Sequence, residues 1–313
     1  MSTQSNMIAD HHLEPLVAAP AIAPWQRFSW SLRRELWEHR AIYFAPLGAA
    51  VLFLIGFLIS NFHLPAQARA ALALGPTYLK HHVEEPYELA SALVMGVALL
   101  VALFYSLDCL QSERRDRSIL FWKSLPVSDF TTVLAKACIP VFVVPLVAFA
   151  VTVATQLAMV LVSAPILAAS GINIAAIWAQ HSLLRSWWLL LYHLITVHGL
   201  WWAPFYGWLL LVSAWARRGS FLWTASWAIV PPFAIGYLEY LVFHTSHFAD
   251  MLQERFSGAG MEAVAVPGTM PWNPMTQLTP GRFLTSTGLW IGLALFTVFL
   301  AGAVRLRRQR GPV

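Results

Sequence analysis

Long apolar stretches alternate with polar breaks along most of the chain. Six of these stretches are close to, or longer than, the roughly twenty residues that a helix needs to cross about 30 Å of hydrocarbon. They cover residues 43–60, 89–107, 133–157, 188–215, 221–243 and 284–304. This pattern predicts an all-α integral membrane protein with six transmembrane helices.

The amino-acid composition supports this prediction. Of the 313 residues, 58% are hydrophobic and only 11% are charged, which excludes an ordinary soluble domain. Residues 1–24 lack the apolar core of a secretory signal peptide, so we expect a flexible cytoplasmic tail there. We expect residues 25–313 to form a single six-span domain, with a loop at 108–132 and a long external segment at 244–283.

Basic residues indicate the orientation of the spans, because Lys and Arg are retained on the cytoplasmic side. Placing the N-terminus inside puts 15 of the 20 lysines and arginines in the cytoplasm. We therefore expect a multi-pass protein of the cytoplasmic (inner) membrane with both termini in the cytoplasm. The same residues account for the net charge of +5, so no nucleic-acid partner is expected. Cys109 and Cys138 lie at cytoplasmic span ends, where thiols stay reduced.

Residues 25–43, WQRFSWSLRRELWEHRAIY, predict a helix ahead of the first span. On a helical wheel its residues form an apolar stripe, a tryptophan pair and a polar arc. These consist of Phe28, Leu32 and Leu36; Trp30 and Trp37; and Arg27, Arg34, Glu35 and Glu38. We interpret it as an interfacial helix on the inner leaflet, with Trp at the headgroups and Arg near anionic membrane lipid. The alternative is a basic span flank with scattered aromatic residues.

The loop at 108–132 combines charged residues with aromatic and aliphatic ones. Residues 118–125 are long enough for two helical turns before Pro126 stops them, and Ser128 or Asp129 can cap the next helix. Apolar side chains surround this short helix almost completely. Such a helix either inserts at the bilayer interface or docks in a groove on a cytosolic protein. The neighbouring charges favour docking, because they can rim the socket.

Signatures of common hydrolases are missing from the sequence. A nucleotide-binding P-loop requires Gly-Lys-Ser/Thr, and none of the three lysines follows a glycine. No His is followed by Glu, which excludes a HExxH zinc protease, and no Gly-x-Ser-x-Gly elbow occurs. We therefore expect no catalytic residues, bound cofactor or metal in this chain.

Histidines and acids within the spans are also candidate functional groups. His193 and His198 are five positions apart, which on an α-helix places them on different faces, so bis-His haem ligation is not expected. Glu239 is the clearest ionisable residue inside a span, where charge is costly. It is either a translocation-path residue in the bundle interior or a carboxyl that reaches outward or bonds to another helix.

Residues 113–136, ERRDRSILFWKSLPVSDFTTVLAK, resemble the first cytoplasmic loop of the permease subunits of type-2 ABC exporters. In that family an acidic residue ends the second span, a short coupling helix precedes Pro-Val/Ile-Ser, and a lysine lies in the third span. The interfacial helix, six spans, cytoplasmic termini and long last external segment are also similar. The motif covers only this loop, whereas the architectural resemblance covers nearly the whole chain.

The resemblance implies a permease subunit that pairs with a second permease, identical or homologous, and with two copies of a cytosolic ABC ATPase subunit. ATP and Mg would bind to the ATPase, so this chain is not expected to be an enzyme. Glu113 would anchor the loop through ion pairs, and residues 119–125 would seat in the ATPase. The expected ATPase-coupling residues are Glu113, Arg114, Arg115, Arg117, Ile119, Phe121, Trp122 and Leu125. The fold does not choose the substrate.

Two other function classes remain open. A secondary transporter or channel without an ATPase would favour inverted repeats and more intramembrane charge, and neither is evident in the sequence. A membrane-embedded enzyme would favour clustered His, Asp or Glu at span ends, and the sequence contains only scattered histidines.

Overall fold

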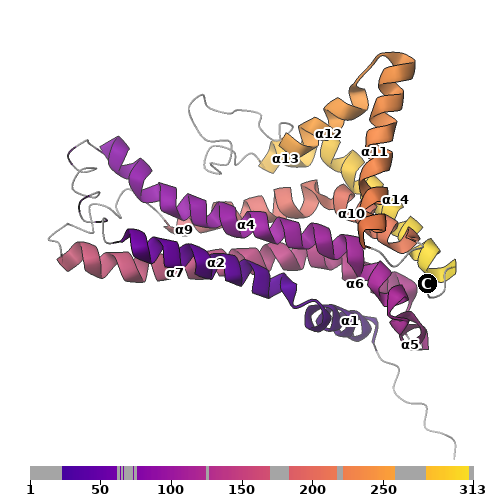
Figure 1. Cartoon of the computed structure of the whole chain (residues 1–313), viewed down its shortest axis with the longest axis horizontal. Helices are drawn as coiled ribbons and strands as arrows, with labels where there is room; N and C mark the ends of the chain where they lie inside the picture. Colours follow the sequence, from indigo (N-terminus) through magenta and orange to yellow (C-terminus); the bar gives the residue numbers. More distant parts are fainter. Residues whose placement is uncertain are drawn as a thin grey trace, which may run out of the picture.

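The computed structural model describes residues 23–61, 64, 66, 73, 76–124, 127–169, 183–216, 221–257 and 280–309 of the chain. Within these residues every element is helical, and most of the long helices run side by side in one bundle (Figure 1). The α-helices are α1 (Pro24–Glu38), α2 (Ala41–Ser60), α4 (Pro76–Arg115), α5 (Ser118–Ser124), α6 (Asp129–Cys138), α7 (Val144–Ala169), α9 (Leu183–His193), α10 (Ala203–Trp215), α11 (Phe221–Phe243), α12 (His247–Ser257), α13 (Pro280–Thr285) and α14 (Thr287–Gln309). Two segments, η1 (Ile139–Val143) and η2 (Leu194–Trp201), are π-helical.

Five helical stretches among the described residues are long and apolar enough to cross a membrane. They are Ala41–Ser60, Glu85–Arg115, Asp129–Ala169, Leu222–Phe243 and Thr287–Gln309. A sixth candidate is the pair Leu183–Trp201 and Ala203–Trp215, whose halves meet at a bend of 45°. The chain is thus an all-α, multi-pass membrane protein, as its sequence predicts. The described residues contain five helices that could span a membrane, or six if the bent pair crosses as one.

The core of the bundle is built on small residues of α4. Ala90, Val94, Ala98 and Ala102 follow one another at intervals of four, and each is between 0% and 3% exposed. Residues four apart share one face of a helix, and small side chains let membrane helices approach closely. Helices α2, α7 and α10 pack against α4, which is therefore the central helix of the bundle.

The two π-helical segments contact each other inside the bundle. Pro140 lies in the first turn of η1, where its missing N–H interrupts the regular α-helical ladder. Gly199 of η2 approaches the carbonyl oxygen of Val141 so closely that a Cβ atom would lie only 2.6 Å from that oxygen. Only glycine fits this position without moving the backbone.

The winding of η2 overturns one expectation from the sequence. His193 and His198 were predicted to lie on different faces, and this prediction is wrong, because their ring centroids are 5.8 Å apart in an edge-on arrangement. A π-helix bonds residue i to residue i+5, so residues five apart lie on the same side. The α-helical spacing assumed from sequence does not hold there.

Helix α11 departs from the bundle and α12 returns toward it, so the two form a hairpin beside it (Figure 1). Pro231 and Pro232 of α11 cannot donate to the carbonyls four residues before them. Trp208 of α10 donates its indole N–H to one of these carbonyls, that of Ala228, at 3.0 Å. Freed carbonyls in membrane helices need partners on neighbouring helices, and α10 provides one here.

Candidate functional site

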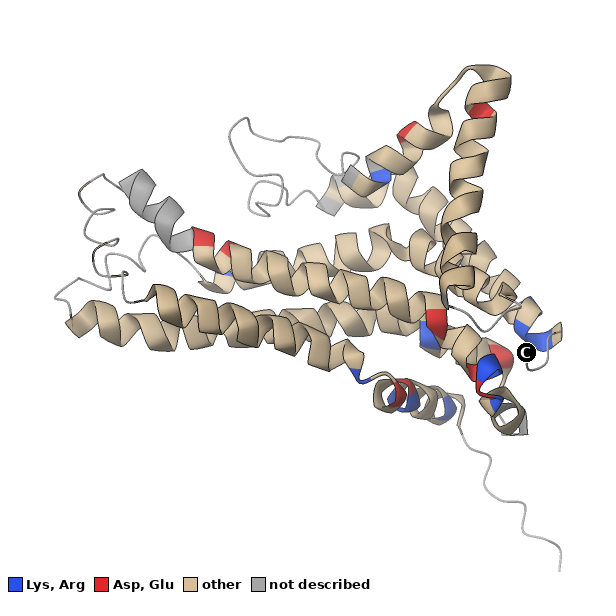
Figure 2. Ribbon diagram, in the orientation of Figure 1, with Lys and Arg blue, Asp and Glu red and all other residues tan. Residues whose placement is uncertain are grey.

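Acidic and basic residues gather at one end of the bundle, where α1, α5, α6 and the C-terminal part of α14 lie (Figure 2). We call this region the charged end. Five of its residues form a largely buried network of ion pairs, which we call the charge cluster. Its members are Arg34, Glu35, Glu113, Lys136 and Arg307.

Lys136 of α6 is the centre of the charge cluster, and its side chain is 0% exposed. Its Nζ donates to both carboxylate oxygens of Glu35 at 2.9 Å. The same Nζ lies 3.2 Å from Oε1 of Glu113. Removing an ammonium group from water is strongly unfavourable unless acidic partners compensate for it. These two carboxylates therefore stabilise Lys136 in the interior.

Glu113, near the end of α4, is bound by three cations. Arg34 donates from Nη2 to its Oε1 at 2.6 Å, Lys136 approaches the same oxygen, and Arg307 donates from Nη1 to Oε2. Arg307 also donates from Nε to Oδ1 of Asp129 at 3.0 Å. Glu113 therefore connects α4 with α1, α6 and α14. The ion pairs expected of Glu113 are present, whereas its part in ATPase coupling stays a prediction.

Helix α1 contributes Glu35, which is 1% exposed. Glu35 accepts hydrogen bonds from two donors in addition to Lys136. The Nη2 of Arg34 donates to its Oε1 at 2.5 Å, and the hydroxyl of Tyr105 donates to its Oε2 at 2.7 Å. Each oxygen of Glu35 thus accepts two hydrogen bonds. The sequence pattern placed Arg34 and Glu35 on one polar arc, with its arginines near anionic lipid, whereas in the structure both residues point into the protein and pair with Lys136 and Glu113.

Electrostatic attraction keeps the α1 members of the charge cluster ionised. Burial disfavours the charged form of Glu35, but Lys136 and Arg34 outweigh it and hold the pKa of Glu35 below its usual value. Burial likewise acts against the charge of Arg34, yet Glu35 and Glu113 raise the pKa of Arg34 above its usual value. Both residues therefore carry their charges at neutral pH.

Two residues on the margin of the charge cluster, Glu38 and His39, have pKa values that are shifted against their charged forms. Burial raises the pKa of Glu38, and Arg34 only partly offsets this effect. Burial, followed by repulsion from Lys136, lowers the pKa of His39. The His39 ring also stands edge-on to Tyr105, with ring centroids 4.8 Å apart. Both shifts favour the uncharged forms of Glu38 and His39.

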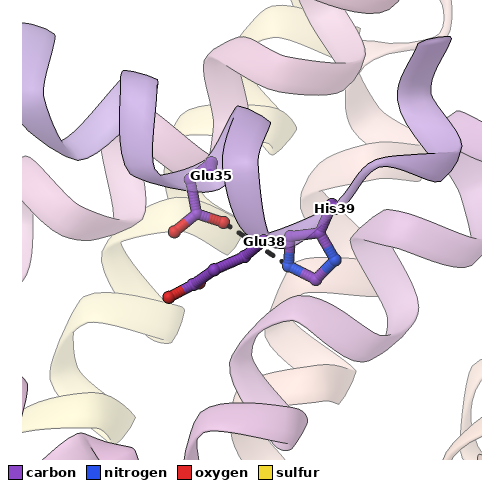
Figure 3. Close-up of side chains that lie close together, drawn as sticks. All are labelled: Glu35, Glu38 and His39. Carbon is purple, nitrogen blue, oxygen red and sulfur yellow. Dashed lines mark ion pairs between the residues drawn. The ribbon is translucent and has the colours of Figure 1, made fainter.

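Glu35, Glu38 and His39 come close enough together to offer three ligand atoms to a metal ion (Figure 3). These atoms lie within 4.8 Å of one another, and Nε2 of His39 is 3.7 Å from Oε2 of Glu35. Both oxygens of Glu35, however, already accept hydrogen bonds from Lys136. A metal ion would have to displace that ammonium group, so we assign no metal to these residues.

Helix α5 follows α4 directly and lies at the charged end (Figure 1). A short helix is predicted from the sequence at this place and is present. Ile119 is 1% exposed and packs into the protein, whereas Leu120 and Phe121 are 58% and 60% exposed. The backbone of Trp122 continues the helix, and Leu125 lies outside the described residues. Leu120 and Phe121 thus form an apolar surface on α5.

The basic residues before α5 divide into a buried one and two exposed ones. Arg114 is 3% exposed and donates to the carbonyls of Ser213 and Ala216 at 2.9 and 2.5 Å. It therefore binds the C-terminal end of α10. Arg115 and Arg117 are exposed, and Arg117 has a left-handed φ of 58°, which turns the chain between α4 and α5. Of the three, Arg115 and Arg117 are accessible to a partner.

Contacts with α10 and α11 fasten the end of α4 further. The hydroxyl oxygen of Ser213 accepts hydrogen bonds from the backbone N–H groups of Leu110 and Gln111 at 3.1 and 3.0 Å. Thr224 of α11 donates to the side-chain oxygen of Gln111. These contacts lie within about one turn of Glu113, so α4 is bonded to both helices close to the charge cluster.

The first turn of α6 follows the sequence prediction. Ser128 is the N-cap, and its hydroxyl oxygen accepts the backbone N–H of Thr131 at 3.1 Å. Asp129 lies in the first turn, where a carboxylate stabilises the helix dipole, and it also binds Arg307. The cap thus fixes the helix that carries Lys136 two turns later.

Glu239 lies away from the charge cluster, in the α11–α12 hairpin. Its Oε1 accepts from the hydroxyl of Thr245 at 2.9 Å and from the N–H of His247 at 3.0 Å, and its Oε2 accepts from the N–H of Phe248 at 2.8 Å. The first N–H groups of a helix have no partner within it. Glu239 therefore caps α12, in agreement with the interpretation of a carboxyl bonded to another helix. Its role in a translocation path stays a prediction.

Sequence reasoning misses the partners of Lys136. Glu35 lies 101 positions from Lys136, and Arg307 lies 194 positions from Glu113. No helical spacing connects residues so far apart. The available signal is the position of Lys136 at the start of a predicted span, because a lysine there needs an acidic partner.

The charge cluster and its neighbour Asp129 have balanced charges. Three cations, Arg34, Lys136 and Arg307, pair with three carboxylates, Glu35, Glu113 and Asp129. Such pairing suits a mechanical junction between four helices better than an acid–base site. None of the known family models, curated proteins or solved structures matches this chain.

Proposed function

We propose that this chain is the permease subunit of an ATP-driven ABC exporter of the second type, working with a separate ATPase. The observation that carries the proposal is α5, a short helix that extends from a base of buried ion pairs. Its residues Leu120 and Phe121 are more than half exposed. Apolar side chains presented on a helix in this way fit a groove on a partner protein.

The base of α5 can pass movement on to the transmembrane helices. Ser118, the first residue of α5, donates its hydroxyl to the carbonyl of Glu113 at 3.3 Å. Through Lys136 and Arg307, Glu113 is paired with α6 and α14. A push on α5 would therefore reach several helices instead of bending a loop.

The ATPase would supply the driving force. Because this chain lacks a P-loop, ATP and Mg would bind to two copies of the partner ATPase. Closure of the ATPase on ATP would displace α5 together with the attached ends of α4 and α6. Packed helices commonly switch between states by such rigid-body shifts, and the energy comes from differential binding of the nucleotide states. A second permease, identical or homologous, would complete the path.

In this arrangement the charged end and both termini face the cytoplasm at the inner membrane, in keeping with the positive-inside rule. Arg115 and Arg117 are exposed beside α5 and would rim the groove of the ATPase, where charges guide association. Trp122 and Leu125 would extend the apolar contact of α5.

Co-purification of the full-length permease with its cognate ATPase tests the proposal. We expect Leu120→Glu to lower the recovered ATPase at least tenfold, on the order of the cost of burying an unpaired carboxylate. Trp122→Ala should act in the same direction. The amount of permease in the membrane should not change.

The matched control is Phe130→Glu, because Phe130 is 57% exposed on the neighbouring α6, compared with 58% for Leu120. This variant should retain the ATPase. Equal ATPase recovery with Leu120→Glu and Phe130→Glu, or a wild-type permease that captures no P-loop ATPase, would refute the proposal.

A further inference from the structure

One face of α1 is exposed although it is rich in tryptophan. Trp25, Trp30 and Trp37 are 69%, 56% and 68% exposed, and Arg33 is exposed on the same side. The guanidinium carbon of Arg33 lies 5.8 Å from the centre of the Trp37 ring, within the range of a cation–π contact. We call these four residues the α1 tryptophan face.

The two acidic residues of α1 do not oppose this basic surface, because Glu35 is buried in the charge cluster and Glu38 is paired with Arg34. Glu35 is 1% exposed within the charge cluster, and Glu38, with 40% of its side chain exposed, lies 3.6 Å from Nε of Arg34. Arg33 and Arg40, the residue just before α2, are both exposed. The outward surface of this segment therefore presents basic groups between tryptophan rings.

Helix α1 lies across the start of the first span. Only His39 and Arg40 separate it from α2. In Figure 1, α1 is foreshortened whereas α2 runs in the plane of the picture, so α1 does not continue the direction of α2. Phe44 and Leu47, in the first turns of α2, are 61% and 45% exposed. The tryptophan face thus lies close to the level at which the apolar surface of the span begins.

We propose that the α1 tryptophan face binds anionic phospholipid headgroups in the leaflet at the charged end. Tryptophan rings favour the boundary between headgroups and acyl chains, and arginines pair well with phosphate. Neutral phospholipid also carries a phosphate, but only anionic lipid adds the net negative charge that attracts Arg33 and Arg40 to the surface. Continuity with the exposed apolar side of α2 favours lipid over a protein partner. This inference does not depend on the proposed exporter function.

Site-specific photocrosslinking of the full-length protein tests this proposal. The photoreactive residue p-benzoylphenylalanine replaces Ser29, which is exposed beside the tryptophan face, in vesicles of phosphatidylcholine and phosphatidylglycerol. A second protein carries it at Ser226, exposed on α11, to report ordinary boundary lipid. Mass spectrometry should find the ratio of phosphatidylglycerol to phosphatidylcholine adducts higher at Ser29 than at Ser226, by about fivefold for each contributing arginine.

Two further variants separate a built surface from general attraction to positive charge. Arg33→Gln combined with Arg40→Gln should bring the adduct ratio at Ser29 down to the value at Ser226. Arg305→Gln combined with Arg308→Gln, which removes exposed arginines from α14 at the same charged end, should leave the ratio at Ser29 unchanged. High salt should also weaken the preference, because it screens exposed charges.

Equal adduct ratios at Ser29 and Ser226 in the wild-type background would overturn the proposal and indicate neutral boundary lipid. Crosslinks from Ser29 mainly to a polypeptide in native membranes would overturn it as well and indicate a protein partner. Neither result affects the co-purification test of α5, so failure of one proposal is distinguishable from failure of the other.

Discussion

The charge cluster and the α11–α12 hairpin each use a carboxylate from an apolar helix, but for different purposes. In the charge cluster, Glu113 binds Arg34, Lys136 and Arg307 from three other helices. In the hairpin, Glu239 binds donors at most nine positions away, at the start of α12. The first arrangement joins distant helices, and the second caps one helix. An acid in a membrane helix therefore marks a group that needs partners, and the partners determine its role.

The hairpin has its own cation, Arg255 of α12, which binds neutral acceptors. Its Nη1 donates to the carbonyl of Trp201 at 2.9 Å, and its Nη2 donates to the carbonyl of Gly288. The guanidinium carbon lies 4.4 Å from the centre of the Trp201 ring, and the Trp201 indole N–H donates to the Arg255 carbonyl at 3.0 Å. Contacts around Arg255 thus attach α12 to η2 and α14 through carbonyl groups and an aromatic ring.

The largest effect is expected from Glu113→Ala, which breaks the charge cluster. It leaves Lys136 and Arg307 with excess buried positive charge, and removing one partner of a buried ion pair costs about 3–5 kcal/mol of folding free energy. The thermal unfolding midpoint of the purified protein should fall accordingly. Asp116→Ala, whose side chain is 62% exposed, should change stability by less than about 0.5 kcal/mol. Equal midpoints for the two variants would contradict the junction role.

A double substitution distinguishes lost charge balance from lost packing at Glu113. Glu113→Gln alone unbalances the charge cluster, whereas Glu113→Gln combined with Arg307→Gln removes one charge of each sign. We expect the double variant to be more stable than the sum of the two single variants predicts, because each single variant loses the same direct pair and the double variant loses it only once. Strict additivity would mean that the two side chains are not coupled.

Arg255→Ala should have the next largest effect, confined to the hairpin. Each hydrogen bond to a charged group contributes about 1.5–3 kcal/mol, and this variant loses those to Trp201 and Gly288. Hydrogen exchange of α12 should accelerate while α6 around Lys136 keeps its protection. Met251→Ala, 43% exposed on the same helix, is the control and should leave exchange nearly unchanged. Faster exchange throughout the bundle would show that the two regions are not independent.

The sequence predicts those features that depend on neighbours along the chain. The apolar stretch at 43–60 coincides with α2, and the short helix before Pro126 and the cap at Ser128 are local signals that the structure reproduces. Hydropathy and helix capping depend on residues that are close together in the sequence, so a short segment is enough to predict them.

The charge cluster could not be predicted in the same way. It depends on how α1, α6 and α14 are placed relative to one another, and no periodic pattern records that placement. The tryptophans of α1 were visible in the sequence, but the inward turn of Glu35 follows from Lys136, 101 positions away. The proximity of His193 and His198 likewise depends on the π-helical winding of η2.

Glu239 gives a smaller effect and tests whether capping is its whole role. Glu239→Ala removes the acceptors of the backbone N–H groups of His247 and Phe248, so it should speed hydrogen exchange at these two residues. Glu239→Gln keeps one oxygen acceptor and should be intermediate. A translocation-path residue would behave differently, because Glu239→Gln would then alter transport in reconstituted protein while α12 stays protected.

His39 gives the smallest effect and tests the pH response at the margin of the charge cluster. Its ordinary pKa of 6.5 is lowered in the folded protein by burial and then by Lys136. The unfolded chain therefore binds this proton more tightly, and the stability present above pH 6.5 is lost as the pH falls through the lowered pKa. When the pH is lowered from about 7.5 to about 5.5, the thermal unfolding midpoint of His39→Gln should fall less than that of the wild type.

Glu38 acts in the opposite sense, because its raised pKa makes the folded protein hold the proton more tightly and gain stability as the pH falls. Since His39→Gln retains Glu38, the difference between this variant and the wild type isolates the histidine. An unchanged acid loss in His39→Gln would mean that the margin of the charge cluster does not contribute to the pH response.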